Sequence, residues 1–488
     1  MSNCTDTATM GTTSPLVAVM GVTMITACLF YLLLKRKSGH QGEVALPPGS
    51  MGLPLLGETL QFFARSPSLD LLPFFKQRLE RYGPIFKTNL VGKDLIVSLD
   101  PELNNYAFQQ EEKAFQIWYP ESFMRILGND NIITSVSSLH KQIRNMILRV
   151  FGPENLRLVL LHEVESTVDR TLESWLERPS IELKTATSSM IFSVTAKWLI
   201  SYEASASSGE LWRNYDAFTR GLLAFPLNIP GTAFYGCMQG RKNVMKTLKQ
   251  LLDCRRNAGS RESKDFFDVV IDELKKDKPM LTEEAALNLL FVLLFASFET
   301  TSTGITAALK FLTDNPKALQ ELVEEHEQIR NLRADPNSDI TWEEYKSMKF
   351  TSYVIHESLR LANIAPVVFR KAKQDVHMKG YTIPEGWTLM ICPSAVHLNP
   401  TTYEDPNAFN PWRWKGISEP VGGSKDFIAF GFGLRFCVGA DFAKLQMAIF
   451  LHCLVTKYRW NVISGGKMVL SPGLGFPEGF NIQLAPKP

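Results

Sequence analysis

A single cysteine lies in a glycine-rich segment near the end of the chain. Cys437 is flanked by Gly431, Gly433 and Gly439, and a helix-like run over 440–454 follows at once. Free backbone N–H groups at the start of a helix stabilise a thiolate, the form of cysteine that binds metals. Glycines let the backbone approach a flat ligand closely. Because lone cysteines are most often simply buried, it is this spacing that predicts a metal ligand.

An acid and hydroxyls interrupt the longest apolar helical pattern, which covers residues 281–311. Its apolar centre is too short to cross a membrane, so we expect a buried core helix. Glu299 and Thr300 follow this centre directly. Burying such groups costs free energy unless they have partners, which makes the position a functional candidate. A threonine can also donate to the carbonyl four residues back, so a purely local role for Thr300 or Thr301 stays open.

Two further charged pairs have helical spacing. Glu357 and Arg360 are three residues apart in an expected helix over 349–361, and His140 and Arg144 are four apart in another. Residues at these spacings share a helix face, and most such pairs are exposed and contribute well under about 1 kcal/mol. Spacing alone therefore leaves a solvated surface as a full alternative to a function for either pair.

The composition excludes several classes of protein. The 488 residues carry a formal net charge of +2 with 21% charged residues, unlike a nucleic-acid-binding protein or a disordered chain. The seven cysteines are scattered without CxxC spacing, which fits a reducing compartment and argues against a structural zinc site. No linker divides the chain after about residue 50, so one large domain over 51–488 is predicted.

The first fifty residues have the pattern of a membrane anchor and a tether. Residues 15–34 are almost all apolar, uncharged and long enough to cross a hydrocarbon core of about 30 Å. Basic residues at 35–37 follow, so the positive-inside rule predicts a lumenal leader over 1–14 and a cytosolic catalytic domain. A cleaved signal peptide is disfavoured because no basic residue precedes the apolar run. Residues 35–50 form a basic and proline-rich hinge.

The segment from Phe430 to Gly439 resembles the haem-binding loop of the cytochromes P450. This resemblance implies that Cys437 is the thiolate ligand of the haem iron. It also implies that Phe430 packs near the sulfur and that Arg435 pairs with a haem propionate. By the same resemblance, Gly439 lets the following helix lie against the porphyrin.

Residues 296–301 resemble the oxygen-activation motif of the same family, which pairs an acid with a threonine. The resemblance implies that Glu299 and Thr300 relay protons for cleavage of the O–O bond of dioxygen. Ser297 departs from the pattern, because glycine is usual there, and this leaves the local distortion of the helix open. Three residues on the Thr300 face of the helix would flank the substrate: Val292, Ala296 and Thr303.

Other parts of the chain match further landmarks of the family. Three residues would hold the haem propionates beside Arg435: His140, Arg144 and Arg370. Three more would form a structural triad that supports the loop over 430–439, called the cysteine loop below: Glu357, Arg360 and Arg413. Another set would face the substrate: Val367, Val368 and Phe476. His397 matches a structural histidine of the family; a metal ligand is the alternative, but no second ligand stands near it in the sequence.

The resemblance covers the chain after the anchor and implies the cytochrome P450 fold, mainly α with a small β region, preceded by one N-terminal transmembrane helix. It implies haem b as cofactor and electrons from NADPH through NADPH-cytochrome P450 reductase. The protein would be a single-pass protein of the endoplasmic reticulum membrane, with no nucleic acid as partner.

Residues 52–59 resemble the opening of the plant P450 group that oxidises sterols, triterpenoids and terpenoid hormones. We therefore expect a haem-thiolate monooxygenase that hydroxylates a sterol or triterpenoid, with repeated oxidation of one carbon left open. Another terpenoid, such as a diterpenoid, a gibberellin precursor or abscisic acid, is the alternative substrate. A reductase-independent P450-like isomerase or dehydratase is disfavoured, because such relatives usually lack the acid and threonine. A carrier without catalysis would not need that pair either.

Overall fold

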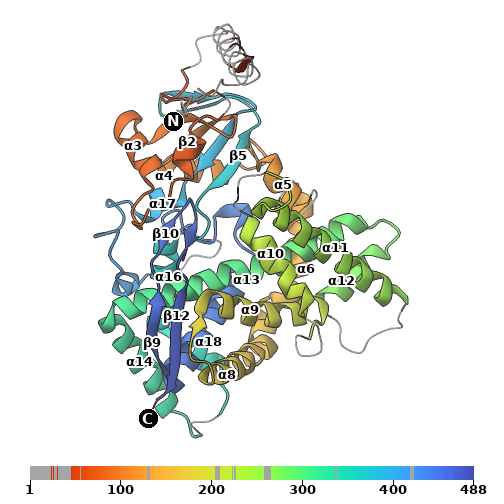
Figure 1. Cartoon of the computed structure of the whole chain (residues 1–488), viewed down its shortest axis with the longest axis vertical. Helices are drawn as coiled ribbons and strands as arrows, with labels where there is room; N and C mark the ends of the chain where they lie inside the picture. The colour runs from red at the N-terminus through yellow and green to blue at the C-terminus, as the bar shows by residue number, and fades with distance from the viewer. Residues whose placement is uncertain are drawn as a thin grey trace, which may run out of the picture.

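The computed structural model describes residues 45–487 except 55, 129–131, 134, 204–208, 223, 225–226, 258–264, 336–337 and 418–422, and also residues 23, 24, 26 and 30. Helices make up most of this chain, and short strands form small sheets (Figure 1). The prediction of a mainly α fold with a small β region is confirmed. The expected leader and most of the expected anchor and hinge lie outside the described residues.

The helices have the following bounds in chain order: α2 (Thr59–Phe62), α3 (Pro73–Tyr82), α4 (Pro101–Gln109), α5 (Glu121–Leu127), α6 (Ser137–Phe151), α7 (Pro153–Asn155), the π-helical η1 (Leu156–Leu160), α8 (Leu161–Leu176), α9 (Leu183–Ile200), α10 (Glu210–Gly221), α11 (Ala233–Asn257) and α12 (Phe266–Leu274). The second half of the chain continues with α13 (Glu283–Asp314), α14 (Pro316–Asn331), α15 (Trp342–Ser347), α16 (Lys349–Ala362), α17 (Pro393–His397), the 3-10 turns η2 (Pro411–Trp414) and η3 (Gly433–Arg435), and α18 (Ala440–Lys457).

Helix α13 crosses the middle of the molecule (Figure 1). Thr282 caps it as predicted, since its hydroxyl accepts a hydrogen bond from the Ala285 N–H at 3.1 Å. Among the described residues it is the one helix long and apolar enough to cross a membrane, but 72% of its most apolar window is buried inside the protein. It packs against α9, α11 and α16. It is therefore the expected core helix.

The strands form one mixed sheet and three smaller antiparallel ones. The five-stranded sheet has the order β1 (Ile85–Leu90), β2 (Lys93–Ser98), β8 (Thr388–Ile391), β5 (Val368–Ala372) and β3 (Phe115–Ile117), with β2 and β8 parallel. The others pair β4 (Ile181–Glu182), β12 (Phe480–Pro486) and β9 (Tyr458–Gly465); β10 (Val469–Leu470) and β11 (Leu474–Gly475); and β6 (Val376–Met378) and β7 (Tyr381–Ile383). The larger sheet and the helical body lie at opposite ends of the molecule (Figure 1).

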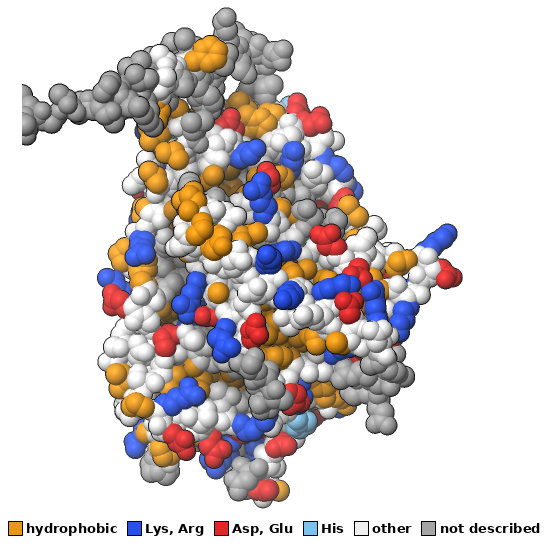
Figure 2. Space-filling view, turned by 45° about the vertical axis from the view of Figure 1, so that its right-hand side comes forward, with side chains coloured by type: hydrophobic (Ala, Val, Ile, Leu, Met, Phe, Trp, Pro, Cys, Tyr) orange, Lys and Arg blue, Asp and Glu red, His pale blue; other side chains and the backbone are white. Residues whose placement is uncertain are grey.

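Helices α16 and α18 pack beside α13 and support the segments expected to do chemistry. A Cβ added at Gly304 of α13 would lie 3.2 Å from the Met447 sulfur of α18, so glycine permits the close approach of these two helices. The cysteine loop precedes α18 directly. On the face shown in Figure 2, charges of both signs are interspersed and hydrophobic side chains gather in patches between them.

Candidate active site

The cysteine loop is closed by backbone hydrogen bonds. The Cys437 N–H donates to the Phe430 carbonyl at 2.9 Å, and the Phe436 N–H donates to the Gly433 carbonyl at 3.1 Å. Gly431 and Gly433 have φ of +76° and +70°, in the left-handed region that glycine adopts without strain. The glycines seen in the sequence thus allow the chain to turn back on itself just before the cysteine.

The thiol of Cys437 is surrounded by protein and is nevertheless accessible. Burial raises the pKa of this thiol, and the Gly439 backbone N–H and the charge of Arg144 oppose the rise only in part. The sequence argument expected the helix start to favour a thiolate; the loss of water outweighs that effect. A bound metal ion reverses the balance, because a coordinating thiol is deprotonated outright. Cys437 is also an exposed residue, so it is open to a ligand despite the protein around its thiol.

Two residues in the centre of α13 are exposed, although the helix around them is half-buried or buried. Ala296 and Thr300 are exposed, whereas Phe298 and Thr301 are buried. Ala296 and Thr300 are one turn apart and share a face, so this face of a largely buried helix is open. The Thr300 hydroxyl donates to the Ala296 carbonyl at 2.9 Å, the local bond that the sequence left open. The hydroxyl is therefore both locally bonded and accessible.

The other residues expected to face the substrate differ in exposure. Val292 and Thr303 are buried, and the Thr303 hydroxyl donates to the Glu299 carbonyl at 2.7 Å. Three lie half-buried around the sheet and the last hairpin: Val367, Val368 and Phe476. Contact of all these residues with a substrate stays a prediction, and the open position of Ala296 favours it most directly.

Glu299 has a cationic partner that the sequence did not indicate. Lys184, at the start of α9, donates from Nζ to Glu299 Oε2 at 2.9 Å, and the two side chains are 25% and 28% exposed. The Glu182 side chain caps α9 by accepting from the Lys184 N–H at 3.4 Å and the Thr185 N–H at 2.8 Å. No pattern in the sequence marks Lys184, because it lies 115 positions from Glu299 in an ordinary helix start.

The four residues expected to hold the propionates lie within electrostatic reach of one another. The pKa of His140 is lowered to about 4, first by burial and then by the charges of Arg435 and Arg144. Burial also lowers the pKa of Arg370; Glu111 opposes that effect and Arg435 adds to it. The fold thus gathers side chains from α6, β5 and the cysteine loop, and it adds Glu111, which the sequence analysis missed.

The predicted triad is present behind the cysteine loop. Arg360 donates from Nε and Nη2 to the two oxygens of Glu357 at 2.9 and 2.8 Å, and Arg413 Nε donates to Glu357 Oε1 at 3.0 Å. Glu357 and Arg360 have fully buried side chains, and that of Arg413 is 10% exposed. His397 Nε2 accepts from the Ile428 N–H at 3.0 Å, and burial lowers the pKa of His397 to about 3. A neutral, hydrogen-bonded imidazole favours the structural interpretation of His397.

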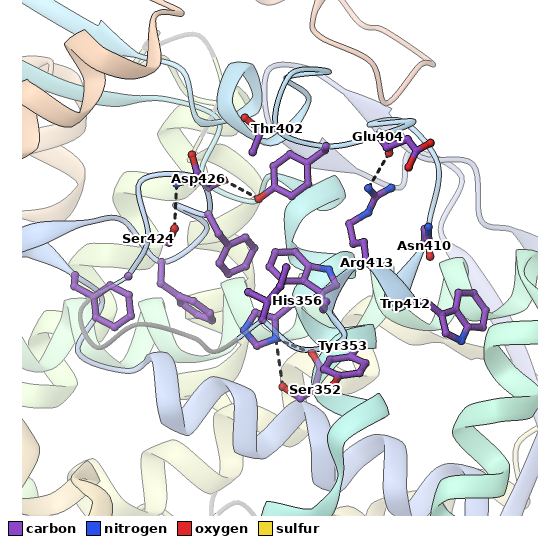
Figure 3. A pocket seen from close by; sticks show the side chains of 17 residues that line it. Ser352, Tyr353, His356, Thr402, Glu404, Asn410, Trp412, Arg413, Ser424 and Asp426 are labelled. Carbon is purple, nitrogen blue, oxygen red and sulfur yellow. Dashed lines mark hydrogen bonds between the residues drawn. The ribbon is translucent and has the colours of Figure 1, made fainter.

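A cavity of about 790 Å³ lies between α16, η2 and the cysteine loop (Figure 3). His356 Nδ1 lies 2.7 Å from the Ser352 carbonyl in its wall, and Arg413 donates to the Glu404 carbonyl at 2.7 Å. The wall includes Phe430 and no residue of α13. This cavity therefore does not reach the open face of α13, and it lies on the side of the loop where Arg413 and α16 support it.

The residues of the site fit a flat metal cofactor with carboxylate groups. His140 Nδ1 and Arg370 Nε are buried without a hydrogen-bond partner among the described residues, which is rare for interior polar atoms. A Cβ added at Gly439 would meet only the Cys437 sulfur within 4 Å, at 4.0 Å, so the face beside the sulfur is open. A soft sulfur ligand, an open face and unpaired donors are what a haem with two propionates requires.

Three features define the class of haem-thiolate oxygenases: an accessible cysteine at a helix start, a threonine on the open face of a central helix with an acid beside it in sequence, and a gathered set of cations. The chain belongs to the cytochrome P450 family: the family model for cytochrome P450 matches residues 47–479. It is therefore a cytochrome P450 monooxygenase.

Several plant proteins are similar along almost the whole chain. "Cytochrome P450 87A3" of Oryza sativa subsp. japonica is 56% identical over 93% of this chain and 88% of its own length. Cucurbitadienol 11-hydroxylase of Siraitia grosvenorii is 40% identical over 96% of this chain and 99% of its own length. Cholesterol 22-hydroxylase CYP90B27 of Paris polyphylla is 35% identical over 96% of this chain and 98% of its own length. These matches identify a plant P450 of the predicted group.

A solved structure has the same fold. Retinoic acid bound cyanobacterial CYP120A1 superposes with a TM-score of 0.79, at 25% identity, over 91% of this chain and 100% of that chain. The agreement at low identity means that the arrangement of helices and sheets is shared although most side chains differ.

Proposed function

We propose that this chain hydroxylates a sterol or a triterpenoid with O2 and with electrons from NADPH delivered by NADPH-cytochrome P450 reductase. The observation that carries the proposal is the open face of Ala296 and Thr300 in the buried centre of α13, in a chain whose Cys437 thiol is also accessible. The relatives named for oxidising cucurbitadienol and cholesterol support this substrate class. Repeated oxidation of one carbon is compatible with the same site.

Haem, when bound, supplies the oxidising chemistry that unactivated C–H bonds require and that side chains alone lack. Cys437 would hold its iron through Sγ, and four residues would hold its propionates: His140, Arg144, Arg370 and Arg435. Half-buried apolar side chains such as Val367 and Phe476 would orient a rigid apolar substrate and exclude water.

Protons would reach the site along α13. Glu299 is partly exposed and paired with Lys184, so its carboxylate can take up a proton from the solvent side. Thr300, the next residue, holds its hydroxyl on the open face by donating to the Ala296 carbonyl. Its oxygen lone pairs remain free to accept a proton, and Thr300 Oγ1 would then give up its own hydroxyl proton toward the open face, breaking its bond to the Ala296 carbonyl.

The proposed setting is the endoplasmic reticulum membrane, with one N-terminal span and the catalytic domain in the cytosol. Support comes from apolar side chains that are exposed just after the hinge: Leu53 (62%), Leu56 (42%), Leu60 (69%) and Phe63 (38%). Such residues lie together on one short segment, and contact with lipid would remove their apolar surface from water.

The test is expression of the full chain in microsomes with a plant reductase, beside a Cys437→Ala variant. We expect the reduced, carbon-monoxide-bound protein to show the long-wavelength Soret band of thiolate-ligated haem, and the variant to lack it. Incubation with cucurbitadienol, cholesterol and NADPH should yield a product that has gained one oxygen atom by mass spectrometry.

Each other outcome contradicts a defined part of the proposal. A Soret band at the histidine-ligated position, or one unchanged in Cys437→Ala, would refute the iron ligand. Oxidation of a diterpenoid, a gibberellin precursor or abscisic acid, with sterols and triterpenoids untouched, would move the substrate to the alternative class. Conversion of a hydroperoxide without reductase would indicate an isomerase or dehydratase.

A further inference from the structure

Glu111 joins two arginines from distant parts of the chain. Its Oε2 accepts from Arg370 Nη2 at 3.1 Å, and its Oε1 accepts from Arg435 Nε at 2.5 Å. The three side chains are 3%, 1% and 9% exposed in that order. Arg370 belongs to β5 and Arg435 to η3 of the cysteine loop, while Glu111 lies in the turn after α4. One buried carboxylate thus ties the sheet to the cysteine loop.

The pairing with Glu111 orients the two guanidinium groups, but one nitrogen of Arg370 remains without an acceptor in the described part of the chain. Arg435 Nη2 also donates to the Ser135 carbonyl at 2.7 Å, and Arg370 Nη1 donates to the Phe369 carbonyl at 2.9 Å. Arg370 Nε has no hydrogen-bond partner among the described residues. A buried cationic donor without an acceptor is costly, so this arrangement is expected to persist because a further acceptor completes it.

The charges around Glu111 match a ligand with two carboxylates. Arg144, Arg370 and Arg435 contribute three positive charges, and His140 is neutral at pH 7 because burial lowers its pKa to about 4. Subtracting the one buried negative charge of Glu111 leaves a net charge of two; Glu112 also lies 3.9 Å from Arg435, but its side chain is 39% exposed and its charge is screened by water. Two ionised propionates would balance it, whereas a site without Glu111 would keep one buried positive charge in excess.

The backbone of the turn that carries Glu111 is strained at the next residue, and the side chains of Glu111 and Glu112 point to different partners. Glu112 has φ of +71°, a conformation uncommon for residues other than glycine. Its side chain turns to α6, where Oε1 accepts from the Ser137 N–H at 3.2 Å and the Ser137 hydroxyl at 2.7 Å. Such strain persists only where the surrounding contacts require it. Glu112 therefore caps a helix, while Glu111 serves the arginines.

We propose that Glu111 is a positioning residue for a porphyrin dicarboxylate: it holds Arg370 and Arg435 in the orientation that receives the two carboxylates and cancels the surplus positive charge. This inference rests on the proposed haem function, because the arginines need propionates to receive. Glu111 itself contacts the arginines and acts through them.

The test measures the holoenzyme's reduction potential and its rate of haem loss to a haem acceptor protein. Glu111→Gln keeps the shape and removes the charge, so the potential should shift to a more positive value, because added positive charge favours the reduced iron. Haem loss should be faster by about tenfold or more, as for other partners of cofactor-holding groups. Glu111→Asp keeps the charge and shortens the reach, so it should raise haem loss without moving the potential.

The matched control is Glu112→Gln, which removes the same charge one residue away, 3.9 Å from Arg435 and on a side chain that is 39% exposed. It should leave haem loss unchanged and shift the potential much less than Glu111→Gln does, because water screens the partly exposed charge. A Glu111→Gln enzyme with parental potential and parental haem loss would overturn the proposal. If that variant does not fold, parental haem loss in Glu111→Asp overturns it equally. Failure of the proposed function is a separate result, namely the absence of a thiolate-ligated spectrum in the parent protein.

Discussion

Glu357 and Glu111 each accept hydrogen bonds from two arginines in the protein interior, but the two clusters differ in how far the arginines are satisfied. Around Glu357, each guanidinium nitrogen of Arg360 has an acceptor, either Glu357 itself or a backbone carbonyl such as that of His397 at 2.6 Å. Around Glu111, Arg370 keeps one buried nitrogen without a partner among the described residues.

This difference distinguishes a cluster that supports the fold, around Glu357, from one that is suited to bind a ligand, around Glu111. Burial and charge do not distinguish the clusters, since Glu357 and Glu111 are almost equally buried and each faces two cations. A network whose arginine donors are all matched needs nothing more and rigidifies the fold. A network with a buried donor left over needs an acceptor from outside the chain. Between these two arginine clusters, the unmatched guanidinium nitrogen of Arg370 is therefore what distinguishes the proposed cofactor region from the support.

The largest expected loss of stability comes from breaking the cluster around Glu357, in which every guanidinium nitrogen of Arg360 has an acceptor. Glu357→Gln leaves Arg360, whose side chain is fully buried, facing an uncharged amide. We expect a loss of about 3–5 kcal/mol in the free energy of unfolding. Urea unfolding followed by circular dichroism measures it, with the exposed Glu404→Gln as control. An unchanged urea midpoint would show that the cluster does not carry the scaffold.

Breaking the cluster around Glu111, in which Arg370 has an unmatched nitrogen, should lower the stability less. Arg370→Gln removes one partner of Glu111, but Arg435 still pairs with that carboxylate and the unmatched donor is removed as well. We expect a loss of about 1–3 kcal/mol by the same urea measurement, together with weaker haem retention. A cost equal to that of Glu357→Gln would remove the distinction between the two regions.

Much of the fold was predictable from local patterns, because those patterns are themselves the cause of the elements. Thr282 caps α13 as expected, and the expected helix over 349–361 is α16. The glycines around Cys437 indicated the loop, since only a tight turn needs them in that spacing. The triad contact was implied by family resemblance and is present in the structure, while its supporting role stays a prediction.

The sequence did not reveal partners that meet only through the fold. Glu111 lies 259 positions from Arg370, and Lys184 lies 115 from Glu299, so no spacing rule connects them. Each looks like an ordinary polar residue of a loop or a helix start. The sequence also did not show that burial raises the pKa of the Cys437 thiol, because helix-start N–H groups are visible in a sequence and the loss of water around the thiol is not.

Acid pH should test one histidine in each region. Burial lowers the pKa of His140 to about 4 and that of His397 to about 3. The unfolded histidines bind protons near pH 6.5, so stability is present above that pH and is lost as pH falls toward the folded values. His140→Gln should flatten this loss by up to about 1.4 kcal/mol per pH unit between roughly pH 6 and 4.

His397→Gln sharpens the contrast, because it also removes the acceptor of the Ile428 N–H. We expect it to flatten the pH dependence and to lower stability at pH 7 as well, whereas His140→Gln should leave stability at pH 7 nearly unchanged. Urea midpoints measured from neutral to acid pH decide the matter. Equal losses of stability at pH 7 for both variants would contradict the assignment of His140 to the cofactor region and indicate a structural role.

The smallest effect on stability is expected at Glu299, a carboxylate with one cation and partial exposure. The ion pair with Lys184 is 25% and 28% exposed, so Lys184→Met should change the free energy of unfolding by less than about 1 kcal/mol. Its effect should lie in proton delivery: Glu299 stays but is no longer oriented, and the ratio of product formed to NADPH consumed should fall, though less than in Glu299→Gln. A loss of stability as large as that of Arg370→Gln, with an unchanged ratio, would place this pair with the scaffold. The reverse result would mean that a carboxylate held by a single partly exposed cation is available for proton transfer because it lacks the second cation that fixes Glu357.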